Sequence, residues 1–278
     1  MADQNAFDWQ GHRGARGLMP ENTIPAFLKA LEYPVKTLEL DICVSKDSQI
    51  IISHEPWFSH HICSQPDGSP VNEETGKSLL IYNMTYEEVK QYDCGLRGNE
   101  RFPRQQKMKA YKPSLPDMVR AVEAYCEEKE REKPWYDIEL KSNPLGYDTI
   151  VPNPQRFVGI TLKELKALGI LDRCNLQSFD VNVLKEINVQ APGLSTSFLV
   201  ENEDGFEKNM ALLDYTPAIY SPYFLFVDSV LVRQVHAKNM KLIPWTVNDV
   251  ENMKALIALG VDGIITDYPD LIAEAERE

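Results

Sequence analysis

The sequence has no long apolar run, since polar residues interrupt every stretch before the roughly 18 apolar residues that a membrane-spanning helix needs. It is also short of basic residues, with 29 Lys and Arg against 42 Asp and Glu. The net charge of −13 disfavours nucleic acid, whose phosphates are held by clustered cations, and anionic membranes. Residues 1–10 lack the basic start and apolar core of a secretory signal. We therefore expect a cytoplasmic protein, or a periplasmic or secreted one if a signal peptide has been removed.

Closely spaced cysteines and a glycine-rich nucleotide loop are missing as well. No two of the five cysteines form a Cys-x-x-Cys pair, so neither a zinc cage nor a dense disulfide framework is implied. Gly11, Gly14 and Gly17 follow the first expected strand, but their spacing is wrong for a dinucleotide-binding loop. The five cysteines are Cys43, Cys63, Cys94, Cys126 and Cys174.

Expected strands alternate with expected helices along most of the chain. A helix between two strands usually returns the chain to the same end of a sheet, so the strands are predicted to be parallel. About eight such units in a chain of this length favour a closed (β/α)₈ TIM barrel. The expected strands are residues 7–12, 37–44, 49–54, 135–140, 175–179, 195–200, 218–220, 241–247 and 263–266, and the clearest helices are about 22–33, 115–126, 162–168 and 250–259.

One region interrupts this alternation. Residues 56–113 are polar, rich in turn-forming residues and poor in strand patterns, and they lie between an expected strand and an expected helix. We interpret residues 7–278 as a single barrel domain and residues 56–113 as an insertion after the second strand region. The insertion is expected to cap the mouth of the barrel.

Acidic residues stand inside one strand that otherwise reads as buried. Glu39 and Asp41 alternate with Leu38, Leu40 and Ile42, and alternate residues of a strand share a face. A charged pair on a strand is usually a solvent-exposed edge, but the apolar neighbours favour a metal-binding pair here.

A second strand repeats this spacing with Glu139 and Lys141. These two could be a plain ion pair on one face, or Glu139 could join the acidic pair of the neighbouring strand. Three converging carboxylates would raise one another's pKa values, and a hard divalent cation relieves that repulsion. Oxygen ligands suit Mg²⁺ or Ca²⁺ better than zinc.

Two of the five histidines stand at expected strand ends. A lone strand histidine is most often a packed core residue, but His12 and His54 both adjoin charged residues where barrel enzymes place their reactive groups. Arg13 beside His12 either braces its loop or offers its planar fork to a phosphate. The other histidines, His60, His61 and His236, are interpreted as structural.

Taken together and in order, these motifs resemble the glycerophosphodiester phosphodiesterases. The resemblance runs from Gly11 to Asp267 and departs from many members after His54, where Glu55 stands in place of Asp. The motifs are Gly11-His12-Arg13-Gly14, Pro20-Glu21-Asn22-Thr23, Glu39-x-Asp41, His54, Glu139-x-Lys141, Gln177-Ser178-Phe179 and Trp245 on the seventh strand.

The resemblance implies a role for each site residue. Glu39, Asp41 and Glu139 are implied to hold one divalent cation, Mg²⁺ or Ca²⁺. His12 and His54 are implied to be the catalytic acid and base. Arg13 and Lys141 are implied to contact the phosphodiester. Asn22 and Thr23 are implied to start the first helix, and Glu21 is assigned to bracing the loop. Trp245 either lines a glycerol pocket or packs.

The implied activity is metal-dependent hydrolysis of glycerophosphodiesters to glycerol 3-phosphate and an alcohol, a hydrolase reaction of lipid and glycerol metabolism. The expected partner is therefore a small-molecule diester, with no nucleic acid and no stable membrane association. Two alternatives are a phospholipase D-like enzyme acting on lysolipids and a non-catalytic protein that binds a phosphorylated polyol. The sequence does not indicate an oligomeric state or the alcohol headgroup.

Overall fold

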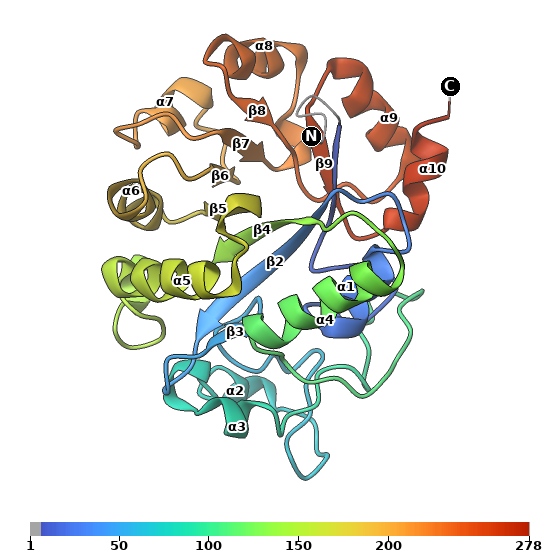
Figure 1. The fold of residues 1–278 in the computed structure, drawn as a ribbon, viewed down its shortest axis with the longest axis vertical. Coiled ribbons are helices and arrows are strands. Elements are labelled where there is room, and N and C mark those ends of the chain that lie inside the picture. The colour runs from blue at the N-terminus through green and yellow to red at the C-terminus, as the bar shows by residue number, and fades with distance from the viewer. Residues whose placement is uncertain (1–6, 278) are drawn as a thin grey trace.

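The computed structural model describes residues 7–277, and its parallel strands form a barrel surrounded by helices (Figure 1). The strands follow the order β8-β7-β6-β5-β4-β2-β1-β9 around the sheet, and β3 pairs with β2 outside that path. The expected (β/α)₈ TIM barrel is therefore confirmed. The strands are β1 (Asp8–Gly11), β2 (Thr37–Val44), β3 (Ile50–Ile52), β4 (Trp135–Leu140), β5 (Cys174–Ser178), β6 (Thr196–Val200), β7 (Ile219–Pro222), β8 (Lys241–Leu242) and β9 (Gly263–Thr266).

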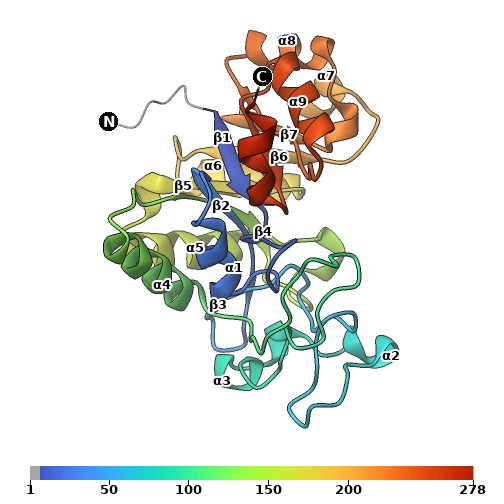
Figure 2. The same ribbon diagram turned by 90° about the vertical axis from the view of Figure 1, so that its right-hand side faces the viewer.

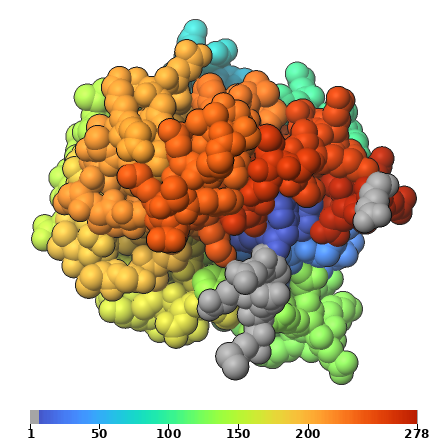
Figure 3. Space-filling model, turned by 90° about the horizontal axis from the view of Figure 1, so that it is seen from above, coloured from blue at the N-terminus to red at the C-terminus, as the bar shows by residue number. Residues whose placement is uncertain are grey.

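Backbone hydrogen bonds bring the last strands together and complete the ring. Asp262 N donates to Leu242 O at 2.9 Å, and Ile265 N donates to Pro244 O at 3.0 Å. On the other side of β9, residues Asp8–Gly11 pair in parallel with Gly263–Thr266. Seen from above, the red C-terminal residues accordingly lie beside the blue N-terminal ones (Figure 3).

Helices cover the outside of the barrel, and their ends carry the expected signals. Thr23 caps the first helix through its side chain, which accepts a hydrogen bond from Ala26 N at 3.4 Å. Gly169 and Gly260 end two later helices in the left-handed conformation that glycine adopts without strain. The helices outside the insertion are α1 (Ile24–Ala30), α4 (Leu115–Glu128), α5 (Pro154–Leu168), α6 (Val181–Gln190), α7 (Phe206–Met210), α8 (Ser229–Ala237), α9 (Val250–Leu259) and α10 (Ile272–Ala275), with 3₁₀ turns η2 (Pro144–Gly146), η3 (Leu171–Arg173), η4 (Phe224–Phe226) and η5 (Pro269–Leu271).

Strand β2 separates the two environments that determine the fold. Leu38, Leu40 and Ile42 are fully buried in the apolar layer between the sheet and the helices. Glu39 and Asp41 alternate with them and therefore face the inside of the barrel. The buried alternation expected from the sequence is confirmed, and it places both acids in the barrel interior.

The barrel interior is not uniformly apolar. Ile219, Ile243 and Ile265 form a small apolar cluster on the side of β7, β8 and β9. Opposite them the interior is polar, and Asn175 Nδ2 donates a hydrogen bond to Asp137 Oδ1 at 2.6 Å. Burial raises the pKa of Asp137 to about 8. Polar side chains inside the barrel therefore continue below the mouth on the side that carries the acidic residues.

Residues 56–113 leave the barrel between β3 and α4 and extend beyond its wall, at the bottom of Figures 1 and 2. They contain α2 (Glu73–Gly76), η1 (Ile81–Asn83) and α3 (Tyr86–Val89). Apolar residues of the insertion, including Phe58 and Ile81, form a separate cluster together with Cys43 and Ile51. Cys63 and Cys94 form a disulfide inside this region, a pairing that cysteine spacing did not indicate.

Two strand predictions need correction. The strand that leads to His54 was expected to be a barrel strand, but β3 runs antiparallel to β2 and lies outside the barrel path. The turn after β2 is too short for a crossover helix, so the chain can only fold back as a hairpin. The strand expected over 241–247 is regular only at Lys241–Leu242, because the chain then continues through Pro244, which has no N–H to donate.

Within residues 7–277, no helix combines the length and the apolar character needed to cross a bilayer.

A guanidinium group fixes the loop that leads from α1 into β2. Arg131 donates hydrogen bonds to the carbonyl oxygens of Leu31, Tyr33 and Val35 at 2.6, 3.1 and 2.6 Å. Replacing Arg131 by Met leaves these acceptors without their charged donor, so we expect Arg131→Met to lower the free energy of unfolding by about 2 kcal/mol in urea titrations. The control is Arg120→Met, which removes an exposed pair with Asp117. Equal midpoint shifts in the two variants would contradict this role.

Candidate active site

The acidic residues meet because neighbouring strands are in register at the mouth of the barrel. Asp41 on β2 lies opposite Glu139 on β4, and Glu139 in turn lies opposite Gln177 on β5. Glu39 precedes Asp41 on the same face of β2, and its Oε1 accepts a hydrogen bond from Gln177 Nε2 at 3.0 Å. Two adjacent strands, β2 and β4, therefore present one carboxylate cluster at their carboxyl ends, and Gln177 on β5 donates a hydrogen bond to it.

The carboxylate cluster has the donor set of a hard-metal site. One oxygen from each of Glu39, Asp41 and Glu139 lies within 4.8 Å of the others, and all three residues are buried. Asp41 Oδ1 is buried without a hydrogen-bond partner among the described residues. Such an oxygen is costly unless a cation meets it. The three residues therefore fit a divalent ion with oxygen ligands.

The protonation states of the cluster show the same electrostatic tension. Burial and the neighbouring Asp41 raise the pKa of Glu39 well above its usual range. Burial also raises the pKa of Glu139 to about 7, although Lys141 opposes this shift. For Asp41, burial acts in the same direction, but Arg13, His54 and Lys141 outweigh it and hold the pKa well below its ordinary value. The raised pKa values of Glu39 and Glu139 reflect the cost of holding three negative charges close together, a cost that a bound cation would reduce.

Two basic side chains flank the acids. Arg13 Nε lies 3.1 Å from Asp41 Oδ2, and its Nη1 donates to Glu21 Oε1 at 2.8 Å. Lys141 Nζ donates to Glu139 Oε1 at 2.7 Å and lies 3.7 Å from Asp41 Oδ1. Both cations also line the cavity above the acids, so each can meet an anion from solvent.

Arg13 is aimed at the cluster by the tight turn after β1. Arg13 and Gly14 both have positive φ angles, of 50° and 82°. A Cβ on Gly14 would lie 2.5 Å from the carbonyl carbon of Ala26, so this position also requires glycine for space. The backbone N–H of Arg13 donates to Glu39 Oε2 at 2.9 Å. The turn therefore connects the first strand directly to the acids.

His12 is held by a carboxylate that sequence reasoning did not single out. Its Nδ1 lies 2.8 Å from Asp267 Oδ1, and Asp267 also accepts from Arg16 Nε at 2.6 Å and from Asn248 Nδ2 at 2.7 Å. An ionised carboxylate only accepts, so Nδ1 carries the proton and Nε2 keeps its lone pair. Burial and nearby Arg16 lower the pKa of His12 to about 4. Its Nε2 lies 3.8 Å from Glu39 Oε2.

His54 reaches the same mouth by a different route. Strand β3 runs back along β2, and Ser53 N donates to Asp41 O at 2.9 Å, so the next residue stands beside the acids. His54 Nδ1 lies 2.9 Å from Glu55 Oε1. Burial and Arg13 lower the pKa of His54. The hairpin therefore brings His54 to the mouth of the barrel, where the sequence predicts it at the end of a barrel strand.

One cavity of about 990 Å³ is lined by both histidines, both cations, Glu39 and Glu139, whereas Asp41 and Asp267 do not line it. Trp245 lines the cavity, and its indole N–H donates to Ser221 O at 2.9 Å. It also packs edge-on against Phe179, so the residue has both a cavity-facing and a packing role. His60 and His61, interpreted as structural from the sequence, also line the cavity. His236 lies elsewhere and pairs with Asp262. The insertion therefore contributes directly to the wall of the site.

Some site residues were missed although their positions carried a signal. Asp267 directly follows β9 and so stands at the same edge as His12, which follows the adjacent strand β1. Arg16 lies in the loop after β1. Nothing in the sequence indicated that Lys112 lines the cavity, because this residue stands at the end of an irregular segment without strand or helix periodicity.

Comparison with known proteins gives one consistent result. The model of the glycerophosphoryl diester phosphodiesterase family matches residues 12–271. The glycerophosphodiester phosphodiesterase of Caldanaerobacter subterraneus subsp. tengcongensis is 27% identical, with 96% of each chain covered.

Solved structures are similar over nearly the whole chain. A candidate glycerophosphoryl diester phosphodiesterase of Silicibacter pomeroyi is 29% identical with a TM-score of 0.83, covering 96% of this chain and 92% of its own. An Oleispira antarctica phosphodiesterase, solved in complex with its product sn-glycerol-3-phosphate, shares the fold at 22% identity with a TM-score of 0.75 and 96% coverage of each chain.

The buried ion pair behind His12 should be measurable as stability. Burial raises the pKa of Asp267, but His12 and Arg16 outweigh it and hold the pKa far below the ordinary 3.8. A carboxyl with a lowered folded-state pKa stabilises the fold above its unfolded pKa, and that stability is lost as the pH falls. We expect Asp267→Asn to lower the free energy of unfolding at pH 7 by about 3 kcal/mol, because Arg16 stays buried without its partner. The difference in the free energy of unfolding between Asp267→Asn and wild type should become smaller below about pH 4.

The matched control is Asp270→Asn, three residues along the chain, whose partner Arg104 is exposed. Its effect should stay below about 1 kcal/mol. A stability difference between Asp267→Asn and wild type that is the same at pH 3 and pH 7 would contradict the assigned ion pair.

Proposed function

Because this chain belongs to the glycerophosphoryl diester phosphodiesterase family, we propose that its cavity hydrolyses glycerophosphodiesters to glycerol 3-phosphate and an alcohol, with a divalent cation bound to the acids. The protein is a phosphoric diester hydrolase on a (β/α)₈ barrel. The observation that carries the proposal is the meeting of two imidazoles and two cationic side chains in one cavity above three buried carboxylates. These are the groups that moving protons and neutralising a phosphate require.

The proposed metal ligands are Glu39, Asp41 and Glu139. Their all-oxygen donor set suits Mg²⁺ or Ca²⁺. Their mutual repulsion, and the lack of a hydrogen-bond partner for Asp41 Oδ1, support occupation by a cation. A divalent ion bound there would supply Lewis-acid polarisation of a phosphate oxygen and a fixed point of attachment for the substrate.

Arg13 and Lys141 are proposed to bind the phosphodiester. Each already neutralises a carboxylate, and each lines the cavity, so a phosphate arriving above the acids meets both side chains. Arg13 can present its planar fork to two phosphate oxygens, while Lys141 acts as a compact charge. Together they oppose the negative charge that accumulates on the oxygens as the P–O bond to the alcohol breaks.

His12 and His54 are proposed to move the protons. One imidazole takes a proton from the attacking oxygen, and the other gives a proton to the oxygen of the departing alcohol. Asp267 and Glu55 each hold Nδ1 of one ring, which leaves Nε2 of both histidines for the reaction. The carboxylates therefore fix the tautomer and the direction of each ring, and they take no proton themselves.

Trp245 is proposed to contact the glycerol half of the substrate. It lines the cavity together with Phe179 and Leu199, which gives an apolar wall against the carbon face of a glycerol. We further propose that residues 7–278 act as one catalytic domain in which residues 56–113 cap the mouth, since Ser59, His60 and Arg97 of that segment line the cavity.

Loss of either imidazole should reduce turnover without unfolding the protein. We expect His12→Ala and His54→Ala each to lower kcat by about 10²–10⁴, the usual contribution of a positioned acid or base. The assay measures release of glycerol 3-phosphate from glycerophosphoethanolamine, and release of choline from lysophosphatidylcholine in parallel tests the lysolipid alternative. His236→Ala is the control, because His236 pairs with Asp262 outside the cavity. Near-wild-type turnover in either variant would exclude that histidine from proton transfer. If wild type binds the diester tightly without turning it over, the alternative of a non-catalytic binding protein is favoured.

Removal of the cation should abolish activity, and its return should restore it. We expect exhaustive chelation to stop the release of glycerol 3-phosphate and added Mg²⁺ or Ca²⁺ to recover it. Calorimetry of the apoprotein should show one binding site that is weakened at least about tenfold in Glu139→Gln, which removes one ligand. Glu132→Gln, a change at an exposed position between α4 and β4, should bind the ion as wild type does. Activity that survives chelation would contradict the metal site.

A further inference from the structure

The cavity has two chemically different ends. Residues on or just after β5, β6 and β8 form one wall, whose apolar and aromatic part is Phe179, Leu199 and Trp245 and which also includes Glu201. The opposite wall comes from the insertion and includes Arg97, Arg101 and Lys112. The insertion and the elements β6 to β8 lie on opposite sides of β2 (Figures 1 and 2). A diester centred over the acids therefore points one alcohol at each wall.

The insertion wall belongs to the most basic stretch of an acidic chain. Residues 97–112 contain six Lys or Arg and one Glu, whereas the whole chain carries a net charge of −13. Within residues 7–277, no carboxylate lies within salt-bridge distance of Arg97, Arg101, Lys107 or Lys109. A run of positive charge that the protein does not neutralise internally remains available to an anion from solvent.

Lys112 places one of these charges at the base of the wall. Its side chain is buried, with 7% of the residue exposed, and it lines the cavity. Nζ donates one hydrogen bond, to Ser53 Oγ at 2.7 Å, and has no carboxylate within salt-bridge distance. An ammonium group has three donors, so two remain for a ligand. A buried cation with spare donors beside a cavity is the signature of an anion site.

The wall is rigid before any ligand arrives. The carboxylate of Asp93 accepts hydrogen bonds from Gly95 N, Leu96 N and Ala110 N, which fastens the two ends of the basic stretch together. The Cys63–Cys94 disulfide and the bonds from Arg97 Nη1 to the carbonyl oxygens of His60 and Cys63 fix the neighbouring loop. The backbone of the wall and the Arg97 side chain are therefore preorganised, which reduces the entropy lost when an anion binds.

Acidic residues offset only part of this charge. Glu21, Glu55 and Glu100 also line the cavity, but Glu21 is paired with Arg13 and Glu55 lies against His54. Arg104, also in the basic stretch, is used internally, since it pairs with Asp270. On the insertion itself, the cavity lining therefore carries three basic residues, Arg97, Arg101 and Lys112, against one carboxylate, Glu100.

We propose that the insertion wall is a headgroup subsite that selects glycerophosphodiesters whose alcohol carries an additional anionic group, a carboxylate or a second phosphate. This inference rests on the proposed hydrolysis. It assigns the alcohol to the wall formed by Arg97, Arg101 and Lys112, and the glycerol to the aromatic wall.

The test compares substrates that differ by one anionic group. Glycerophosphoserine differs from glycerophosphoethanolamine by a carboxylate, and the phosphate ester of glycerophosphoglycerol differs from glycerophosphoglycerol by a phosphate. We expect kcat/KM to be at least about tenfold higher for the anionic member of at least one pair, because a direct charge contact is worth about that factor. The first pair tests recognition of a carboxylate, and the second pair tests recognition of a phosphate. The preference should also weaken in high salt.

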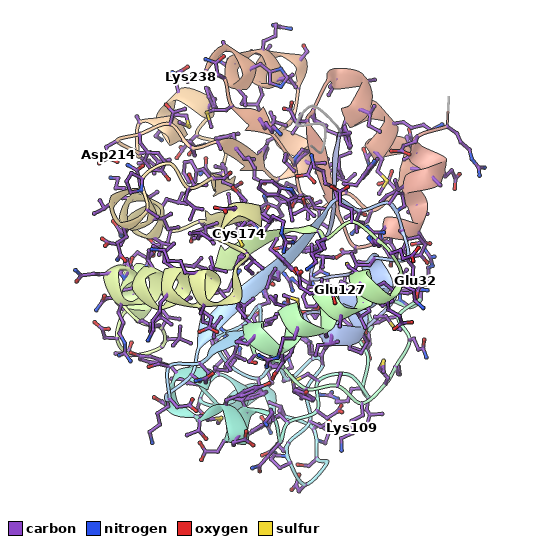
Figure 4. The ribbon with its side chains drawn as sticks, viewed as in Figure 1. Glu32, Lys109, Glu127, Cys174, Asp214 and Lys238 are labelled. Atoms are coloured by element: carbon purple, nitrogen blue, oxygen red, sulfur yellow. A yellow bond between two sulfur atoms is a disulfide. The ribbon has the colours of Figure 1, made fainter. Side chains whose placement is uncertain are left out.

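Arg101→Glu is the informative variant, because Arg101 is exposed and can be changed without loss of core packing. We expect it to remove the tenfold preference. The matched control is Lys109→Glu, which makes the same charge change in the same basic stretch outside the cavity lining; the residue is labelled on the lower part of the molecule in Figure 4. Lys109→Glu should keep the wild-type preference.

Failure of this inference is distinguishable from failure of the proposed hydrolysis. Release of glycerol 3-phosphate with no charge preference, or with a preference that Arg101→Glu does not change, would overturn the subsite and leave the hydrolysis standing. If no diester is turned over, calorimetric binding of the same four compounds to the intact protein decides the subsite. Equal affinities within each pair would then overturn it.

Discussion

Repulsion among three buried carboxylates is the constraint around which this molecule is arranged. Glu39, Asp41 and Glu139 meet because their strands are in register, and burial denies them the water that would separate their charges. Arg13 and Lys141 reduce the repulsion without removing it, since the pKa values of Glu39 and Glu139 remain raised. A group of acids that its own protein leaves undercompensated fits a cation, which is the basis of the proposed metal site.

The surrounding structure serves to keep that arrangement rigid. A left-handed turn after β1 aims Arg13 at the acids, and a hairpin outside the barrel returns His54 to the mouth. Asp267 holds both His12 and Arg16, so the last strand and the first share one buried ion pair. Each side chain of the site is thus fixed by a second interaction at its base, which is what preorganised chemistry requires.

The insertion makes this barrel chemically asymmetric. One wall of the cavity is aromatic and comes from barrel loops, and the other is basic and comes from a segment with its own core and disulfide. In a chain of net charge −13, a stretch with six basic residues and one acidic residue marks a local exception to the overall composition.

Several features followed from local sequence alone. The alternation of apolar and acidic residues in β2 determined that Glu39 and Asp41 face one side, because a strand has a period of two. The repeated strand and helix patterns determined the barrel, and the ordered motifs from His12 to Trp245 determined the family. Tertiary structure alone decided that β3 pairs with β2 as a hairpin, that Lys112 lines the cavity, and that Cys63 bonds to Cys94. Periodicity reports the direction of a side chain relative to its own element, whereas contacts between segments far apart in the chain depend on how the whole barrel and its insertion pack.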